Sequence, residues 1–350
     1  MKIFINSLIL LFSLLISLIL AESIARLFFA PVDYLQPEVL IHDQLGHIVA
    51  PESGGHDAWG FRNRSVPEHS DIVAIGDSQT YGDSAISSDS WPAQLEKISG
   101  NSVYNLATGG YGPGHYLYLL QNYAVKLSPK KIIIGFYYGN DLIDSFNFKN
   151  HIQGDFSEFD KKRTQYPLRF WLSGHSVIYR IITFSGIGDM VRKAESHKKA
   201  TSSALLTYNK PPIYTIFTPE KRLLALNLHE DKVTQGLDYS ISYLLQISEF
   251  CKSHNLDLTI VLIPTKERVY YKHLETEKIT TAYQELISNE NEVDSKIKNA
   301  LTDHQISFVD AYSGLSTVAD SAQIYPLNDD GHPNKNGYNI IAKMILATFK

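Results

Sequence analysis

Short apolar runs alternate with segments of helical spacing over two parts of the chain, from about residue 70 to 142 and from 237 to 349. The runs are continuously apolar, which is typical of strands buried on both faces of a parallel sheet. Helices between such strands would cover the two faces of that sheet. The expected strands are 71–75, 102–106, 131–137, 256–263 and 306–310, and the expected helices are 91–98, 113–127, 237–254, 292–304 and 337–349.

The pattern breaks down between these two parts, from about residue 143 to 235, where aromatic residues and scattered charges surround Pro211 and Pro212. We interpret this stretch as an insertion that forms a cap, a lid or a small subdomain. Residues 71–350 are expected to form one domain of the α/β class that contains this insertion. The predicted architecture is a three-layer α/β/α sandwich with a parallel five-stranded, flavodoxin-like sheet.

The N-terminal segment is almost wholly apolar from Ile3 to Ala21, and these nineteen residues suffice for a membrane-spanning helix. A cleaved signal peptide would end in small residues, and Ala21 could precede a cleavage site, but Ile19 is a poor residue at the −3 position. Because apolar character resumes beyond this point, we favour an uncleaved signal anchor over residues 1–29. Lys2 would stay in the cytoplasm, which places the domain outside it, either membrane-anchored or, after cleavage, secreted.

Residues 30–70 are rich in Pro, Gly, His and Asp, and we interpret them as a stalk and a lead-in to the domain. The formal net charge of −5 and the lack of a long Lys/Arg run argue against a nucleic-acid partner. The one cysteine, Cys251, lies in an apolar helical pattern and is interpreted as a core residue. The lipid bilayer is the partner that the N-terminal segment predicts.

Polar residues and glycines follow the first three expected strands at their carboxyl ends, where open parallel sheets bind ligands. Ser78 follows the first strand, and its hydroxyl is either a nucleophile or a helix cap. Gly109, Gly110 and Gly112 follow the second strand, and they either let a backbone N–H approach an oxyanion or simply form a turn. Asn140 follows the third strand, where its amide is a neutral donor for an oxyanion or part of a turn.

Asp329 and His332 lie three residues apart on the segment before the last expected helix. A serine hydroxyl needs a base, and an imidazole with a pKa near neutrality suits that role. The imidazole in turn needs a carboxylate that fixes its tautomer, and Asp329 can supply it. The alternatives are a surface histidine, and calcium binding by Asp329 and Asp330, for which no further acidic residues lie nearby in the sequence.

The order of these residues resembles the blocks of the SGNH (GDSL-like) hydrolase superfamily, over about residues 70–142 and 237–349. The resemblance implies that Ser78 is the nucleophile and Asp329 and His332 complete a triad. It also implies an oxyanion hole formed by the N–H groups of Ser78 and Gly110 and by the Asn140 amide. The N-terminal anchor and the Asn-Leu-x-x-x-Gly-Tyr-Gly segment are similar to membrane-anchored bacterial envelope members of this superfamily.

Two positions depart from the pattern of the superfamily. Gln79 stands where the GDSL name has leucine. Many members of the superfamily also lack this leucine, so the departure changes little. Tyr138 stands two residues before Asn140, where the third block usually has glycine.

Three residues beyond the fourth expected strand, Lys266, Arg268 and Tyr270, could bind an anionic or sugar substrate, or belong to a solvated helix start. Metal ligation by His42 and His47 is not expected, because the sequence offers no convincing third ligand near them. No cofactor is expected, since the predicted chemistry of an acyl-serine intermediate needs none.

The predicted function is that of an exported serine esterase that cleaves O-acyl esters, acetyl esters above all, on envelope carbohydrate. An O-acyltransferase with the same triad is the first alternative, in which a sugar hydroxyl replaces water. A non-catalytic assembly or carbohydrate-binding protein of the envelope is the second. A binder has no need of a nucleophile, a base and a carboxylate together, and this favours the enzyme.

Overall fold

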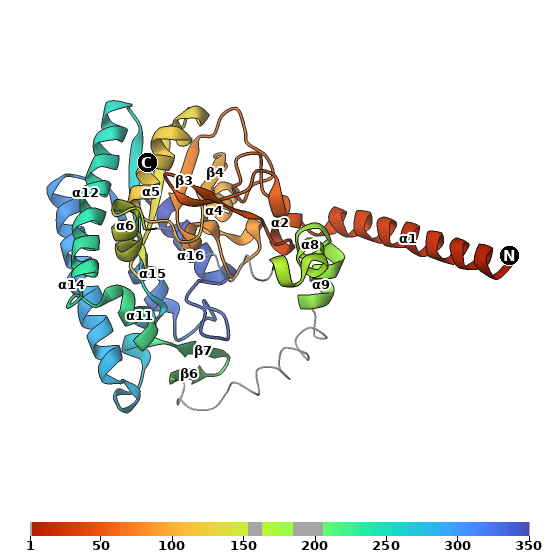
Figure 1. Ribbon diagram of the computed structural model, residues 1–350. Helices are drawn as coiled ribbons and strands as arrows, with labels where there is room; N and C mark the ends of the chain where they lie inside the picture. Colours follow the sequence, from red (N-terminus) through yellow and green to blue (C-terminus); the bar gives the residue numbers. More distant parts are fainter. Residues whose placement is uncertain (1, 153–162, 185–205, 350) are drawn as a thin grey trace. The chain divides into compact units, whose positions relative to one another are not determined.

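The computed structural model of the protein describes residues 2–152, 163–184 and 206–349 (Figure 1). The chain divides into two compact units. The first comprises Met1–Leu40, Val49–Gly60 and Asp155–Ser203, and the second comprises Ile41–Ile48, Phe61–Gly154 and Ala204–Lys350. The second unit contains the whole central sheet.

The central sheet has five parallel strands in the order β4-β3-β5-β8-β9. This is the flavodoxin-like order, in which the first strand lies between the second and the third, so the predicted fold class is confirmed. β3 is buried along its whole length because it lies inside the sheet and helices cover both faces. The strands are β3 (Ile72–Gly76), β4 (Val103–Ala107), β5 (Lys131–Tyr137), β8 (Asp257–Ile263) and β9 (Phe308–Asp310).

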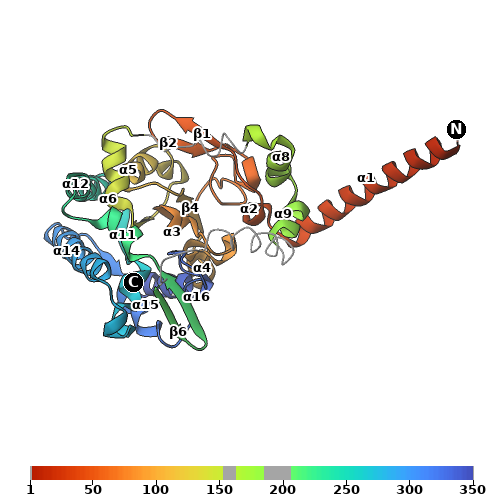
Figure 2. The same ribbon diagram turned by 60° about the horizontal axis from the view of Figure 1, so that its bottom comes forward.

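Helices pack in two groups around this sheet (Figure 2). α4 (Trp91–Ser99), α15 (Ala311–Val318) and α16 (Lys335–Leu346) share a buried apolar cluster with β3. α5 (Pro113–Asn122), α6 (Asp141–Lys149) and α12 (Asp231–Ser253) pack against one another. The other elements of this unit are α3 (Ser78–Tyr81), β6 (Leu206–Lys210), β7 (Ile213–Phe217), α11 (Pro219–Leu226), α13 (Lys266–Tyr270), α14 (Thr281–Asp303) and the 3₁₀ turns η2 (Ser87–Asp89), η3 (Ala124–Leu127), η4 (Tyr271–His273) and η5 (Thr276–Lys278).

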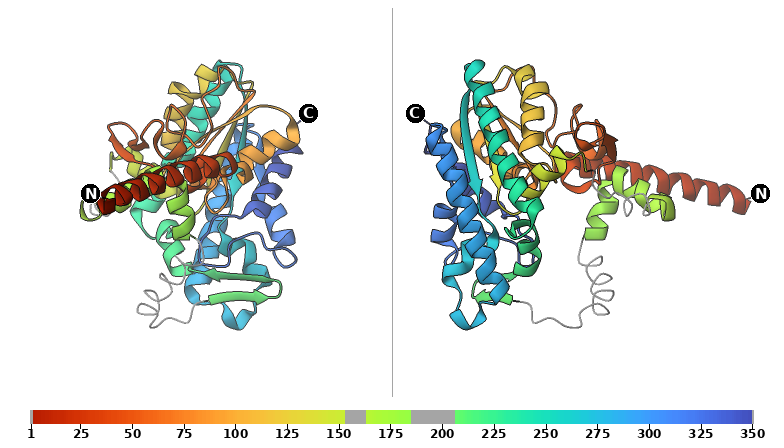
Figure 3. Two further views of the ribbon diagram at one scale, coloured as in Figure 1. Left: turned by 90° about the vertical axis from the view of Figure 1, so that its right-hand side faces the viewer. Right: turned by 60° about the vertical axis from the view of Figure 1, so that its left-hand side comes forward.

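The first unit contains a long apolar helix, α1 (Lys2–Phe28), and a small group of short helices beside its C-terminal end (Figure 3). A cluster of three buried side chains holds the group together, namely Ala25 of α1, Leu35 directly after α2, and Val177 at the start of α9. The short elements are α2 (Pro31–Tyr34), η1 (Ser53–Gly55), α8 (Pro167–His175) and α9 (Val177–Phe184). Two strands, β1 (Val39–His42) and β2 (Gly46–Val49), form a two-stranded sheet in which the chain passes between the units.

The stretch predicted as an insertion, about 143–235, falls into parts of different kinds. α6 packs tightly on α12, because a Cβ at Gly236 would lie only 2.1 Å from the carbonyl oxygen of Leu142. The antiparallel pair β6–β7 and helix α11 also belong to the second unit. Within this stretch, only residues 155–203 are assigned to the first unit.

Candidate active site

Ser78 lies at the tight turn between β3 and helix α3, at the carboxyl end of the sheet. Asp77 caps this helix, because its carboxylate accepts a hydrogen bond from the N–H of Gln79 at 2.9 Å. The N–H of Ser78 is the first of the helix and has no acceptor within it. A backbone donor is therefore directed to the place where the nucleophile would react.

Two glycines leave the space that α3 needs above the sheet. Gly76 ends β3 and pairs in register with Gly135 of β5. A Cβ at Gly76 would lie 2.1 Å from Thr80 Oγ1, and one at Gly135 would lie 2.2 Å from the same atom. Both strands must therefore lack a side chain at this level for α3, and with it Ser78, to take its position.

The His332 imidazole reaches Ser78 from the segment that precedes α16, across 254 positions of sequence. Its Nε2 atom lies 2.8 Å from Ser78 Oγ, which is a hydrogen-bond distance. The end of this segment is held by Asn334, whose side chain caps α16 and whose N–H donates to the carbonyl of Ile324 at 3.0 Å. The structure thus brings together the two side chains that the sequence analysis paired as nucleophile and base.

The carboxylate beside His332 belongs to Asp330, and the prediction of Asp329 is wrong in this respect. Asp330 Oδ1 lies 2.5 Å from His332 Nδ1 and accepts the N–H of the same residue at 3.0 Å. Asp329 is exposed. The physical reason is a tight turn, in which Asn328 Oδ1 accepts the N–H of Asp330 at 3.1 Å and turns the Asp330 side chain toward the imidazole.

Charge around the imidazole favours its protonated form. Burial lowers the pKa of His332, but the hydrogen bond with Asp330 and the charges of Asp83 and Asp330 outweigh burial and raise this pKa above its ordinary value. Asp83 Oδ2 lies 3.9 Å from His332 Nε2, on the side of the ring that faces Ser78. Burial raises the pKa of Asp330, yet hydrogen bonds from His332 and Ser84 hold it below its usual range.

The residues predicted to form an oxyanion hole follow three strands of the sheet: Ser78 follows β3, and Gly110 and Asn140 follow β4 and β5, the strands on either side of β3. Gly110 has a φ of 77°, a conformation that favours glycine, and a Cβ at the preceding Gly109 would lie 3.7 Å from the Cβ of Ser78. Asn140 Nδ2 donates to Asp144 Oδ2 at 2.7 Å. The Asn140 side chain also forms a hydrogen bond with Asp77, so two carboxyl groups hold the amide in one orientation. The positions are compatible with the predicted role, which stays a prediction.

Two further carboxyl groups near the nucleophile escaped the sequence analysis. Asp77 is fully buried, and burial raises its pKa to about 6 against the opposing effects of the Gln79 N–H and His332. Burial and the neighbouring charge of Asp77 also raise the pKa of Asp144 well above its ordinary value. The signals in the sequence are slight, since an aspartate beside a helix start is commonly a cap and Asp144 falls in the stretch predicted as an insertion.

The three side chains predicted to bind substrate are buried, and the structure contradicts that prediction. Lys266 is 0% exposed, and its Nζ donates to the carbonyl oxygens of Asn328 at 3.1 Å and Asp330 at 2.9 Å. Lys266 therefore holds the loop that carries Asp330. Arg268 donates to Asp294 at 3.0 Å, and Tyr270 packs among aromatic rings. Distant carbonyl groups satisfy the Lys266 ammonium group, which allows its burial, whereas the Tyr270 hydroxyl is buried without a hydrogen-bond partner among the described residues.

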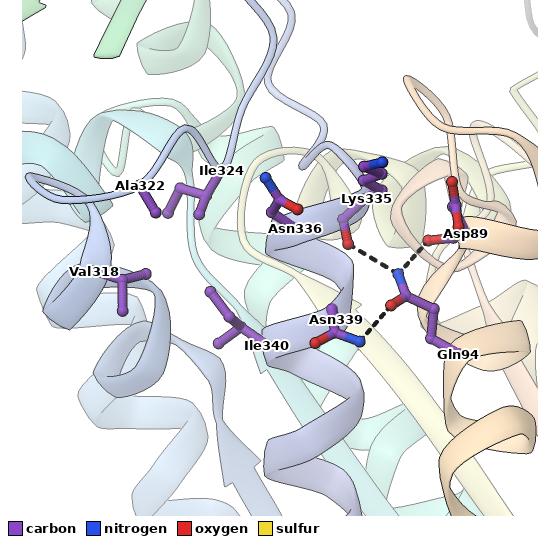
Figure 4. A pocket seen from close by; sticks show the side chains of 9 residues that line it. All are labelled: Asp89, Gln94, Val318, Ala322, Ile324, Lys335, Asn336, Asn339 and Ile340. Atoms are coloured by element: carbon purple, nitrogen blue, oxygen red, sulfur yellow. Dashed lines mark hydrogen bonds between the residues drawn. The ribbon is translucent and has the colours of Figure 1, made fainter. Parts of the chain in front are cut away.

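A separate hollow lies between α4 and α16 and contains none of these residues (Figure 4). The three amide side chains in its lining, those of Gln94, Asn336 and Asn339, are already paired. The Gln94 amide donates to the carbonyls of Asp89 at 2.6 Å and Lys335 at 2.9 Å, and Asn339 donates to Gln94 at 2.5 Å. These contacts tie the two helices together, and we assign the hollow no chemistry.

A hydroxyl, an imidazole and a carboxylate joined in series at the carboxyl ends of parallel strands is the arrangement of serine hydrolases. The chain belongs to the GDSL-like lipase/acylhydrolase family, whose model matches residues 72–345. It is accordingly an ester-hydrolysing enzyme. The match includes every residue of the site described above.

Solved structures with similar folds come from several bacteria. A lipolytic protein of the G-D-S-L family from Desulfitobacterium hafniense is 14% identical, with a TM-score of 0.42 and coverage of 79% of this chain and 98% of that chain. Phospholipase A1 from Streptomyces albidoflavus is 11% identical, with a TM-score of 0.44 and coverage of 80% and 100%. An acetylxylan esterase from Geobacillus stearothermophilus is 12% identical, with a TM-score of 0.41 and coverage of 81% and 97%. No curated protein matches the chain.

Proposed function

We propose that the protein hydrolyses neutral O-acyl esters through an acyl-serine intermediate formed on Ser78. The observation that carries this proposal is the unbroken series from Ser78 Oγ to His332 Nε2 at 2.8 Å and from His332 Nδ1 to Asp330 Oδ1 at 2.5 Å. His332 takes the hydroxyl proton as Ser78 attacks the ester carbonyl, and it then gives the proton to the leaving alcohol. Water resolves the acyl-enzyme by the same route in reverse.

The oxyanion of the tetrahedral intermediate would accept hydrogen bonds from the N–H groups of Ser78 and Gly110 and from the Asn140 amide. Donors of this kind act because they are already oriented before charge develops. The bond from Asn140 to Asp144 supports this role, since it holds the amide in one orientation. Loss of one such donor costs about 3 kcal/mol of transition-state stabilisation in comparable sites.

The charges around Ser78 favour a neutral acyl group such as acetyl. Asp83 and Asp330 both contact the imidazole, and Asp77 and Asp144 lie close to the nucleophile turn. An anionic substrate would be repelled wherever these groups are ionised. With the apolar N-terminal helix as a membrane anchor, we propose an extracytoplasmic enzyme that removes acyl groups, acetyl above all, from carbohydrate of the cell envelope.

A fluorophosphonate probe tests the nucleophile directly. Full-length protein in detergent should be labelled, and Ser78→Ala should not be, whereas Ser88→Ala, a change of an exposed serine nearby, should label like the wild type. Labelling of folded Ser78→Ala protein would refute the assignment.

Release of acetate from O-acetylated oligosaccharides, measured with and without unacetylated acceptor sugars, tests the reaction. Equal release in both conditions is expected of an esterase. Release that depends on the acceptor would instead indicate the acyltransferase that the sequence also allows.

A further inference from the structure

Helices α8 and α9 are clamped to the C-terminal end of α1 by a pair of charged residues on α1. Glu22 accepts hydrogen bonds from the N–H groups of Val177 at 2.9 Å and Ile178 at 3.2 Å, at the start of α9. Arg26 donates to the carbonyl of His175 at 2.7 Å, at the end of α8. Each charge has the sign that stabilises the helix end it meets.

The clamp lies in the last two turns of α1, beyond the part of its candidate membrane span that has no charged residue. The candidate span is Phe4–Phe28, and Glu22 is its first acidic residue. The apolar part before Glu22, residues 4–21, rises about 27 Å at 1.5 Å per residue, close to the ~30 Å of a bilayer's hydrocarbon core. Glu22 and Arg26 would then lie where hydrocarbon meets headgroups, together with the ends of α8 and α9 that they hold.

Helices α8 and α9 lie beside the C-terminal end of α1 (Figure 1), and they carry large apolar and aromatic side chains that are exposed. Leu168 and Trp171, one helical turn apart on α8, are 69% and 55% exposed, and Ile182 of α9 is 52% exposed. Tyr166, just before α8, is also exposed. Tryptophan and tyrosine concentrate at membrane interfaces because their rings are apolar with one polar end.

The charge of the same segment suits a lipid surface. Residues 163–184 contain no acidic residue and four basic ones, Arg163, Arg169, His175 and Arg180, of which Arg163 pairs with Glu38 and Arg180 donates to the carbonyl of Tyr34. Basic residues beside an apolar face are typical of helices that lie in the interface and are attracted to anionic headgroups. The exposed apolar side chains, the basic residues and the contact with α1 therefore all favour the lipid bilayer as the partner of this surface.

We propose that α8 and α9 lie in the membrane interface and insert Leu168, Trp171 and Ile182 at the boundary of headgroups and acyl chains of the bilayer that α1 spans. α1 and the two short helices then act together as one membrane-bound platform. The inference rests on the proposed membrane anchoring by α1 and is independent of the chemistry at Ser78.

Quenching of tryptophan fluorescence by brominated lipids tests this proposal. Full-length protein would be reconstituted into vesicles of phosphatidylcholine and phosphatidylglycerol, with or without 6,7-dibrominated phosphatidylcholine. The chain has three tryptophans, of which Trp91 is buried and Trp59 serves as a matched control. We expect quenching in wild-type protein, its loss in Trp171→Phe and its retention in Trp59→Phe. Leu168→Asp should weaken quenching without lowering the Tm.

Equal quenching in wild-type and Trp171→Phe protein would overturn the proposal. So would an unquenched Trp171 in protein that forms dimers in the vesicles, because a second copy would then cover this face. Use of Ser78→Ala protein throughout separates the outcome from catalysis. Flotation of the vesicles after carbonate extraction separates it from anchoring: failure to float refutes the anchor, and flotation without quenching refutes only the role of α8 and α9.

Discussion

Replacement of Asp330 by Asn should impair catalysis far more than the same replacement of Asp329. Asp330 contacts both the ring and the N–H of His332, whereas Asp329 is exposed. The imidazole becomes a cation in the transition state, and the paired carboxylate stabilises that cation. A unit charge pair about 4 Å apart at an effective dielectric constant of ~20 is worth about 4 kcal/mol. This energy corresponds to a loss of about a thousandfold in kcat/KM for Asp330→Asn.

The assay is hydrolysis of p-nitrophenyl acetate by full-length protein in detergent, with Asp329→Asn as the matched control. Thermal unfolding of both variants would show whether the fold is retained. We expect kcat/KM of Asp329→Asn to stay within about threefold of the wild type, since solvent and salt largely screen the charge of an exposed side chain. An equal or larger loss in Asp329→Asn than in Asp330→Asn would refute the reasoning.

Three further predictions concern groups around the triad. Because the pKa of His332 is raised, kcat/KM should fall as the pH drops through a midpoint above about 6.5. Asp83→Asn should lower that midpoint, because it removes a negative charge beside the imidazole. An unchanged midpoint would contradict the role given to Asp83. Lys266→Met should lower both kcat and Tm, because it removes the hydrogen bonds that hold the loop carrying Asp330. We expect a loss of about 2 kcal/mol in the free energy of unfolding, measured by urea titration. Unchanged stability would contradict this role of Lys266. Asp144→Ala should reduce kcat about tenfold by releasing Asn140, while Asp144→Asn should retain most activity; similar rates in the two variants would argue that Asp144 does not position the amide.

The sequence was sufficient to predict the sheet, because continuous apolar runs at regular intervals admit few other arrangements. β5 was predicted over the residues it occupies, and the order of the strands followed from the fold class. Helix starts were harder, and α12 begins at Asp231 instead of 237 because its first turns pack on α6 through Gly236. That contact joins segments almost a hundred positions apart and leaves no local pattern.

The site was predictable to the level of loops but not to the level of single atoms. Ser78 and His332 followed from the order of polar residues at the strand ends. The choice between Asp329 and Asp330 depends on a turn that Asn328 stabilises, and adjacent acidic residues in a loop do not reveal it. Lys266 looked exposed because it is charged, yet carbonyl groups more than sixty positions away accept its hydrogens.

Gly76 of β3 and Gly135 of β5 together leave the space that Thr80 occupies, so the position of Ser78 depends on both strands. A methyl group added to β5, on a strand that holds no member of the triad, would lift the turn carrying Ser78 away from an imidazole supplied by the far end of the chain. The activity of Ser78 is thus sensitive to any side chain added at Gly76 or Gly135, because of its volume more than its polarity. The triad therefore requires that these two strand positions carry no side chain.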